Sequence, residues 1–304
     1  MKILVLGAGA GGGLPQWNCH CANCRAARAG DLAPASQSSL AVSADGDNWF
    51  LLNASPDLRQ QIFDRKQLHP REGLRHSPIA GVVLTNADVD HVTGLLTLRE
   101  VQPLAVYSTR RVAGVVRSNV VFNVLNPSVV DWRDLALEQR IELRDREGRA
   151  SGIVVTPFAV PGKVALWLED PSLANFGSIG EDTIGLKVEC GGKRFFYTPG
   201  CASLPAELAR RLAGADLVFF DGTTFTDTEM IDLGLGVKTA QRMGHMSQSG
   251  PEGSMEAFAE LGVKRKIYVH INNSNPVWRL DAPERAAVAA AGWEIGYDGM
   301  EITL

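Results

Sequence analysis

The feature that most constrains the fold is an order of strand, polar turn and helix that recurs in both halves of the chain. Residues 79–84 are apolar, end at a polar turn and precede leucines with helical spacing at 95–101. In the second half, residues 217–220 are apolar and end at Asp221, and a helical pattern follows at 254–261. Alternation of this kind is typical of sheets covered by helices. We therefore expect an α/β fold.

No low-complexity linker, short repeat or charge block separates the two halves, so we predict a single domain over residues 1–304. Two similar runs fit two mixed sheets packed face to face with helices outside, a four-layered αββα sandwich. A single doubly wound sheet is the alternative. Polar residues at strand ends favour the sandwich, because two sheets can bring such ends to one edge. These residues are Asp88, Asp90, His91, Asp221 and His270.

Two finer expectations concern individual elements. The apolar spacing over residues 110–125 predicts one helix. Near the end of the chain, residues 293–297 and 301–304 have the composition of short strands, and we predict that they pair with each other.

Composition excludes several classes of partner. The chain has 304 residues with 30 Lys+Arg against 34 Asp+Glu, a net charge of −4, and 45% hydrophobic residues. A mildly acidic protein lacks the long-range attraction to nucleic acids and anionic membranes that a basic one has. No apolar run approaches the roughly 20 residues that span a bilayer, and the first apolar run is too short for a secretory signal. We expect a cytoplasmic protein that binds neither nucleic acid nor membrane.

A glycine-rich loop follows the first apolar run and matches the pattern G-x-G-x-x-G at Gly7, Gly9 and Gly12. A dinucleotide site needs a helix that opens at the third glycine and an acidic residue at the end of a second strand. Residues 14–19 are a poor helix opening, and Asp31 does not follow a strand. We expect the glycines to allow a tight backbone path beside a site instead.

Three of the five cysteines, Cys19, Cys21 and Cys24, form a C-x-C-x-x-C cluster. A disulfide framework would spread an even number of cysteines along the chain, whereas clustered thiols are typical of a structural zinc site. The fourth ligand stays open between His20 and a residue of the loop 270–275. The alternative is a set of three small buried thiols.

Asp88, Asp90 and His91 lie between an apolar strand and a helical pattern. Asp88 or Asp90 could simply cap that helix, but capping alone gives no role to the adjacent His91. Asp90 and His91 could instead be metal ligands at the end of a strand, completed by His270 from the end of another. His245 is a further histidine placed where chemistry could use it.

Five segments together resemble the family of coenzyme PQQ (pyrroloquinoline quinone) biosynthesis B proteins, which belongs to the metallo-β-lactamase superfamily. They are residues 6–19, the cysteine cluster, and residues 84–91, 243–246 and 268–276. The resemblance implies the αββα sandwich and a role in making PQQ. It also implies a small-molecule ligand, PQQ or its precursor, and other proteins of that pathway as partners.

The metal motif of the superfamily, H-x-H-x-D-H, is only half retained in this chain. Its four positions are Asn86, Asp88, Asp90 and His91, so the two histidines of a first metal are absent. Where the superfamily has a further histidine and a bridging aspartate, this chain has residues 161–162 and 198–200, which contain neither. The resemblance therefore does not extend to a dinuclear hydrolytic centre.

Two histidines and one carboxylate, His91, His270 and Asp90, leave positions open on a metal, as in non-haem Fe(II) oxygenases. With the resemblance, this set predicts iron-dependent hydroxylation of a tyrosine-derived PQQ precursor. One alternative is a carrier that takes PQQ or its precursor towards the periplasm. Another is phosphodiester or ester hydrolysis by superfamily analogy.

Resemblance to nucleases of the superfamily implies that His245 pairs with Asp221 beside the metal, where the pair could shuttle a proton or hold a phenol. The alternative for Asp221 is a cap on the turn that follows it. Asp88 could ligate the metal, orient a ligand or bind substrate.

Overall fold

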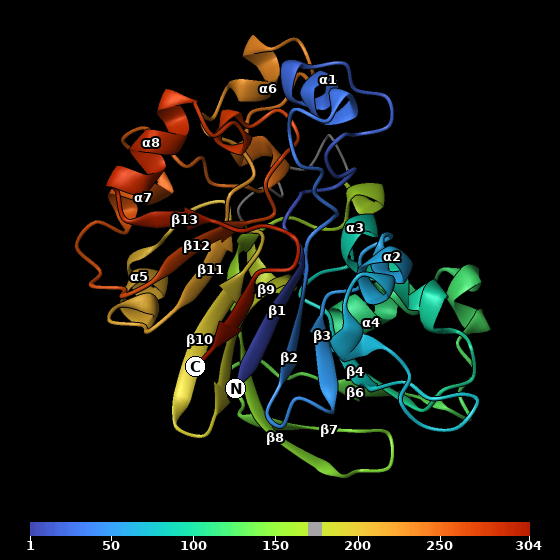
Figure 1. Cartoon of the computed structure of the whole chain (residues 1–304). Helices are drawn as coiled ribbons and strands as arrows, with labels where there is room; N and C mark the ends of the chain where they lie inside the picture. The colour runs from blue at the N-terminus through green and yellow to red at the C-terminus, as the bar shows by residue number, and fades with distance from the viewer. Residues whose placement is uncertain (170–177) are drawn as a thin grey trace.

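The strands form two mixed sheets that pack face to face (Figure 1). The computed structural model describes residues 1–169 and 178–304, and within them each sheet has seven strands. The first sheet has the order β14 (Glu301–Thr303), β1 (Lys2–Gly7), β2 (Ser39–Ser43), β3 (Trp49–Leu52), β4 (Ile79–Val83), β5 (Leu104–Ser108) and β6 (Val130–Asp134). The second has the order β13 (Trp293–Ile295), β12 (Lys266–Val269), β11 (Val218–Asp221), β10 (Lys193–Thr198), β9 (Ser178–Cys190), β8 (Ala150–Gly162) and β7 (Ile141–Arg144).

Helices cover the outer faces of both sheets. Figure 1 shows α2 and α4 on the outer side of the first sheet, and α5, α7 and α8 on the outer side of the second. The α-helices are α1 (Ala22–Ala29), α2 (Leu58–Phe63), α3 (Val89–Val92), α4 (Arg110–Arg117), α5 (Ala206–Leu212), α6 (Glu229–Asp232), α7 (Ser254–Ala257) and α8 (Pro283–Ala290). The 3-10 helices are η1 (Lys66–Leu68), η2 (Thr93–Leu98), η3 (Val120–Val124), η4 (Leu166–Leu168), η5 (Gln241–Met243) and η6 (Pro276–Trp278). The four-layered αββα sandwich is confirmed.

Alternation along the strands places one apolar side chain inside the sandwich and the next under the helices. In β1, Ile3 and Val5 belong to a cluster that also contains Tyr197 of the opposite sheet. Leu4 and Leu6 belong to a second cluster under the outer helices. Within the described residues, no helix is long and apolar enough to cross a membrane.

Strand direction decides where polar strand ends meet. Strands β3 to β6 are mutually parallel, and so are β10 to β13. The carboxyl ends of parallel strands lie at one edge of their sheet, and Asp221 ends β11 while His270 follows β12. Figure 1 shows the connections from both sheets gathered at this edge, together with α1, α3 and α6.

The expected pairing of residues 293–297 with 301–304 is wrong. Strand β13 pairs with β12 in the second sheet, and β14 pairs with β1 in the first. The chain crosses between the sheets at Asp298, whose carboxylate accepts the backbone N–H groups of Ala8 and Ser36 at 3.0 and 2.7 Å. Each short strand therefore closes a different sheet.

The single helix expected over residues 110–125 is also wrong, because α4 ends at Arg117 and η3 follows it. The hydroxyl of Ser118 and the side-chain amide of Asn119 each donate a hydrogen bond of 2.8 Å to the Val115 carbonyl. Side-chain bonds of this kind compete with the helical ladder.

Candidate metal centres

Three predicted ligands meet at the shared edge of the sandwich. Within the described residues, ligand atoms of Asp90, His91 and His270 all lie within 4.8 Å of one another. Asp90 Oδ2 is 3.0 Å from His270 Nε2 and 3.8 Å from His91 Nε2. Asp90 and His91 lie in α3, which follows β4 of the first sheet, and His270 directly follows β12 of the second.

His91 is oriented by a neutral neighbour. Its Nδ1–H donates a hydrogen bond of 2.7 Å to the side-chain oxygen of Asn86, so its Nε2 carries the lone pair. That Nε2 atom is buried and has no hydrogen-bond partner among the described residues. An orphaned imidazole lone pair beside a carboxylate fits a metal ion, and a histidine that binds metal usually donates its other ring N–H to an acceptor such as the Asn86 oxygen.

Burial and mutual charge shift the pKa values in this group. Burial alone would raise the pKa of Asp90, but the two histidines beside it, of which His270 is hydrogen-bonded to the carboxylate, outweigh burial and lower that pKa. Burial lowers the pKa of His91, against the opposing charge of Asp90. Burial would lower the pKa of His270 as well, but its hydrogen bond to Asp90 raises that pKa. The lowered pKa of Asp90 favours the ionised carboxylate and the lowered pKa of His91 favours the neutral imidazole, and these are the forms that bind metal.

A second group beside the first joins Asp221, His245 and His270. His245 Nδ1–H donates to Asp221 Oδ2 at 2.7 Å, and the His245 ring stacks on the His270 ring at 5.1 Å between centroids. Asp221 is fully buried, and the charge of His245 outweighs that burial and lowers the pKa of Asp221. Asp221 also accepts the backbone N–H of Thr223 at 3.0 Å, so it caps the following turn and holds His245 at once.

His245 also lines an open pocket of about 380 Å³, together with Ser203, Asp227 and Gln241. The Asp221 pairing leaves its Nε2 as the nitrogen that can exchange protons with a molecule in this space. The predicted pairing of His245 with Asp221 is therefore present in the geometry.

Asp88 lies apart from the ligand groups. It precedes α3, but its side chain makes no capping hydrogen bond to that helix. Its Oδ2 is 3.7 Å from Lys163 Nζ, which also lies 2.9 Å from Glu169 Oε1. Lys163 directly follows β8. The structure thus places a lysine ammonium, not a metal donor, beside Asp88.

The three clustered cysteines converge at the N-terminus of α1. Their sulfur atoms lie within 4.8 Å of one another. The side-chain amide of Asn273 points at all three, with Nδ2 3.1, 3.6 and 3.3 Å from the sulfurs of Cys19, Cys21 and Cys24. His20 is exposed and lies outside this group. Of the two candidates for the fourth ligand, the loop 270–275 therefore supplies the side chain that faces the sulfurs.

The glycine-rich loop runs directly beside the first group. Gly12 and Gly13 have φ of 93° and 63°, and no helix opens there, so the dinucleotide site is not formed. The Ala10 N–H donates to the carbonyl of Ile271, the residue after His270, at 2.8 Å. A Cβ on Gly11 would lie 3.3 Å from Asp90 Oδ2. The loop therefore gives the close backbone approach that was expected.

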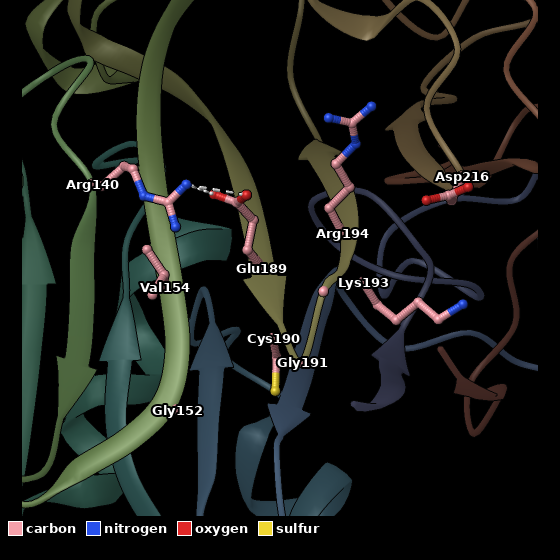
Figure 2. Close-up of a pocket in the computed structure, with 10 residues that line it drawn as sticks. Arg140, Gly152, Val154, Glu189, Cys190, Gly191, Lys193, Arg194 and Asp216 are labelled. Carbon is pink, nitrogen blue, oxygen red and sulfur yellow. Dashed lines mark hydrogen bonds and ion pairs between the residues drawn. The ribbon is translucent and has the colours of Figure 1, made fainter.

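A pocket of about 430 Å³ lies at the far end of the second sheet (Figure 2). It surrounds the turn from β9 to β10, where Arg140 pairs with Glu189 at 3.1 Å beside Cys190, Lys193 and Arg194. Because β10 runs from this turn towards the shared edge, the pocket is at the end of the sheet opposite to Asp221. It is therefore separate from both candidate metal centres.

Comparison with known proteins identifies close relatives. Residues 48–271 match the β-lactamase superfamily domain. Coenzyme PQQ synthesis protein B of Methylobacterium radiotolerans is 50% identical and covers 100% of both chains. That of Rhizobium meliloti is 54% identical, over 100% of this chain and 98% of its own. The crystal structure of Zn(2+)-bound PqqB from Methylobacterium extorquens is 51% identical and superposes with a TM-score of 0.96 over 100% of both chains.

Proposed function

Because the chain belongs to the coenzyme PQQ synthesis protein B family, within the β-lactamase superfamily, we propose that it hydroxylates a tyrosine-derived precursor of PQQ at a mononuclear Fe(II) centre. The single observation that carries this proposal is the orphaned Nε2 of His91 beside Asp90 and His270. Two histidines and one carboxylate would bind the ion from one side and leave other coordination positions open. Bound Fe(II) would supply the activation of O₂.

Asp221, His245 and Asp88 lie at the same edge of the sandwich and would transfer protons to or from the substrate and orient it. Asp221 holds the His245 ring so that Nε2 can take the phenolic proton of the substrate or return a proton to oxygen. Asp88, which lies beside Lys163 and three residues before His91, would orient the substrate. In the overall reaction a ring C–H becomes C–OH, one atom of O₂ enters the product and the other leaves as water. Two electrons and two protons come from a small-molecule reductant.

We propose that Cys19, Cys21 and Cys24 hold a structural zinc ion, as the Zn(2+)-bound relative suggests. Their sulfurs fit thiolate coordination. Rotation of the Asn273 amide by half a turn would place Oδ1 where Nδ2 now faces the sulfurs. Asn273 Oδ1 is then the fourth ligand. We place the protein in the cytoplasm, where these thiols stay reduced, with other proteins of the pathway supplying the precursor.

The test loads the zinc-containing protein with Fe(II) without oxygen, then adds a tyrosine-derived substrate, a reductant and ¹⁸O₂. We expect O₂ uptake coupled to a gain of one labelled oxygen atom in the product. Asp90→Asn should abolish both, and His76→Gln, at a histidine away from the edge, should change neither.

The second candidate function is that of a carrier of PQQ or its precursor, and it predicts the opposite result in this experiment. The hydroxylase proposal is wrong and the carrier proposal is right if two results are found together. Iron-loaded protein then neither consumes O₂ nor adds oxygen to the substrate, and metal-free protein binds PQQ as tightly as iron-loaded protein does.

A further inference from the structure

The hydroxyl of Thr223 lies at the centre of the second group of potential ligands. Its Oγ1 is 2.7 Å from Asp221 Oδ1, 3.1 Å from His245 Nδ1 and 3.0 Å from His270 Nδ1. It is also 3.0 Å from the carbonyl oxygen of His270. Thr223 is buried, with 5% of its surface exposed. A single hydroxyl thus contacts every member of this group.

The direction of these hydrogen bonds follows from counting protons. A threonine hydroxyl has one proton to donate and two lone pairs that accept. The shortest contact is to the ionised carboxylate of Asp221, which is the strongest acceptor present. Thr223 therefore donates to Asp221 and accepts the Nδ1–H of His270. The other ring nitrogen of His270, Nε2, then faces Asp90.

The backbone around His270 supports the same orientation. His270 has φ of 55°, in the left-handed region that residues other than glycine rarely adopt. The segment that follows it is held by Asn272 N–H, which donates to the Thr223 carbonyl at 2.9 Å, and by Ile271 N–H, which donates to the Ala8 carbonyl at 2.9 Å. Thr223 thus holds both the ring and the main chain at this position.

We propose that Thr223 is a positioning residue that links the Asp221 carboxylate to His270 and fixes Nε2 as the metal-binding nitrogen. This inference rests on the proposed assignment of the metal to Asp90, His91 and His270. It also predicts that the ion does not bind between Asp221, His245 and His270. The Thr223 hydroxyl occupies the centre of that second group, and its proton is already committed to Asp221.

Three variants test the proposal. Thr223→Val removes the hydroxyl at nearly constant shape, and Thr223→Ser restores it. Thr224→Val is the matched control, because the neighbouring Thr224 is fully buried and its hydroxyl has no hydrogen-bond partner among the described residues. The measurement is the affinity of the centre for Co(II) and Fe(II) in protein whose cysteine cluster is filled with zinc.

We expect Thr223→Val to weaken metal binding at the centre by about 10- to 100-fold, the usual effect of removing a residue that is hydrogen-bonded to a metal ligand. Thr223→Ser should stay close to the wild-type affinity, and Thr224→Val should equal it. Wild-type affinity in Thr223→Val, or an equal loss in Thr223→Ser, would overturn the proposal, because a role in packing alone does not depend on the hydroxyl.

A measurement on the unmodified protein gives an independent answer. In protein saturated with Zn(II), ¹⁵N NMR of the His270 ring should find the proton on Nδ1, and a proton on Nε2 contradicts the proposal. Neither measurement uses turnover, so a protein that binds metal as described but consumes no O₂ disproves the hydroxylase while leaving Thr223 in its role. If Asp221→Asn loses the metal and Asp90→Asn keeps it, the ligand assignment itself is wrong.

Discussion

At the scale of single residues, hydrogen bonds with neutral side chains determine which atoms of the ionisable side chains can bind a ligand or a metal ion. The Asn86 oxygen takes the Nδ1–H of His91 and also accepts the backbone N–H of Asp88 at 3.0 Å. Asn86 occupies a position that is histidine in the metal motif of the superfamily. On the proposed assignment, the side chain at this position therefore orients a metal ligand, His91, instead of binding a metal ion itself.

The cysteine cluster gives the first prediction. Cys21→Ser should remove one of three thiolate ligands, so the zinc content of the purified protein falls from one per chain towards zero and the melting temperature drops. Cys190→Ser, at the opposite end of the second sheet, is the matched control and should change neither quantity. Elemental analysis and thermal unfolding measure the two effects. Unchanged zinc in Cys21→Ser would rule out this site.

The second prediction separates proton transfer from metal binding. His245→Gln and Asp221→Asn should each slow turnover by about 100- to 10,000-fold, the usual contribution of general acid–base catalysis. The iron content should stay near one per centre, because neither side chain belongs to the Asp90 group. Steady-state kinetics and iron analysis of the same samples check both statements. Loss of iron in His245→Gln would make His245 a direct ligand.

The third prediction concerns Glu229, which accepts hydrogen bonds from the Phe225 N–H and the Ser274 hydroxyl. Burial raises its pKa from 4.5 to about 6. A carboxyl with a raised folded pKa favours the folded state below its unfolded pKa, and that contribution is lost as the pH rises through the folded pKa. Glu229→Gln should therefore be up to about 2 kcal/mol more stable than wild type at pH 8 and equal to it near pH 4.

Urea unfolding of both proteins at the two pH values, at one zinc concentration, measures this difference. Glu260→Gln, at an exposed glutamate, is the control and should be neutral at both. A Glu229→Gln protein with the same advantage at pH 4 and pH 8 would show that ionisation is not the cause.

At the scale of elements, helix α4 has a side-chain cap that can be tested. The hydroxyl of Thr109 accepts the N–H of Val112 at 3.1 Å and donates to the carbonyl of Glu181 in β9 at 2.8 Å. Thr109→Ala should lower the free energy of unfolding by about 1 kcal/mol, the typical value of an N-cap, whereas Thr109→Ser keeps both bonds. Denaturant unfolding measures this, and equal losses in the two variants would argue against the cap.

The elements also show what sequence reasoning reaches. Apolar periodicity and the polar strand ends were enough for the sandwich, because burial forces those patterns locally. The pairing of β13 with β12 and of β14 with β1 was missed, because it depends on Asp298 binding backbone groups that are distant in sequence. Among site residues, Asp90, His91 and His270 were predicted to lie together, and they do. Thr223 was missed, and Asn273 was included only as one residue of the loop 270–275, because a neutral side chain shows its role only through its tertiary contacts.

At the scale of the whole molecule, we propose that residues 1–304 unfold as one domain. The inner hydrophobic cluster contains residues of both sheets, such as Val5 and Tyr197, so neither sheet keeps its core when the other is lost. Thermal unfolding followed by near-ultraviolet circular dichroism and by zinc release should give one coincident transition. Two separated transitions, or a stable fragment after limited proteolysis, would indicate two domains.

The short loop after β12 has a consequence for how the two centres respond to metal supply. His270 and Asn273, three positions apart, face different centres. On the proposed assignment, an ion in either centre restrains the backbone that presents a ligand to the other. Binding free energies linked in this way are reciprocal. A shortage of zinc would thus lower the affinity of the Asp90, His91 and His270 centre for iron. On the proposed function, a cell with ample iron but little zinc would then still produce too little PQQ.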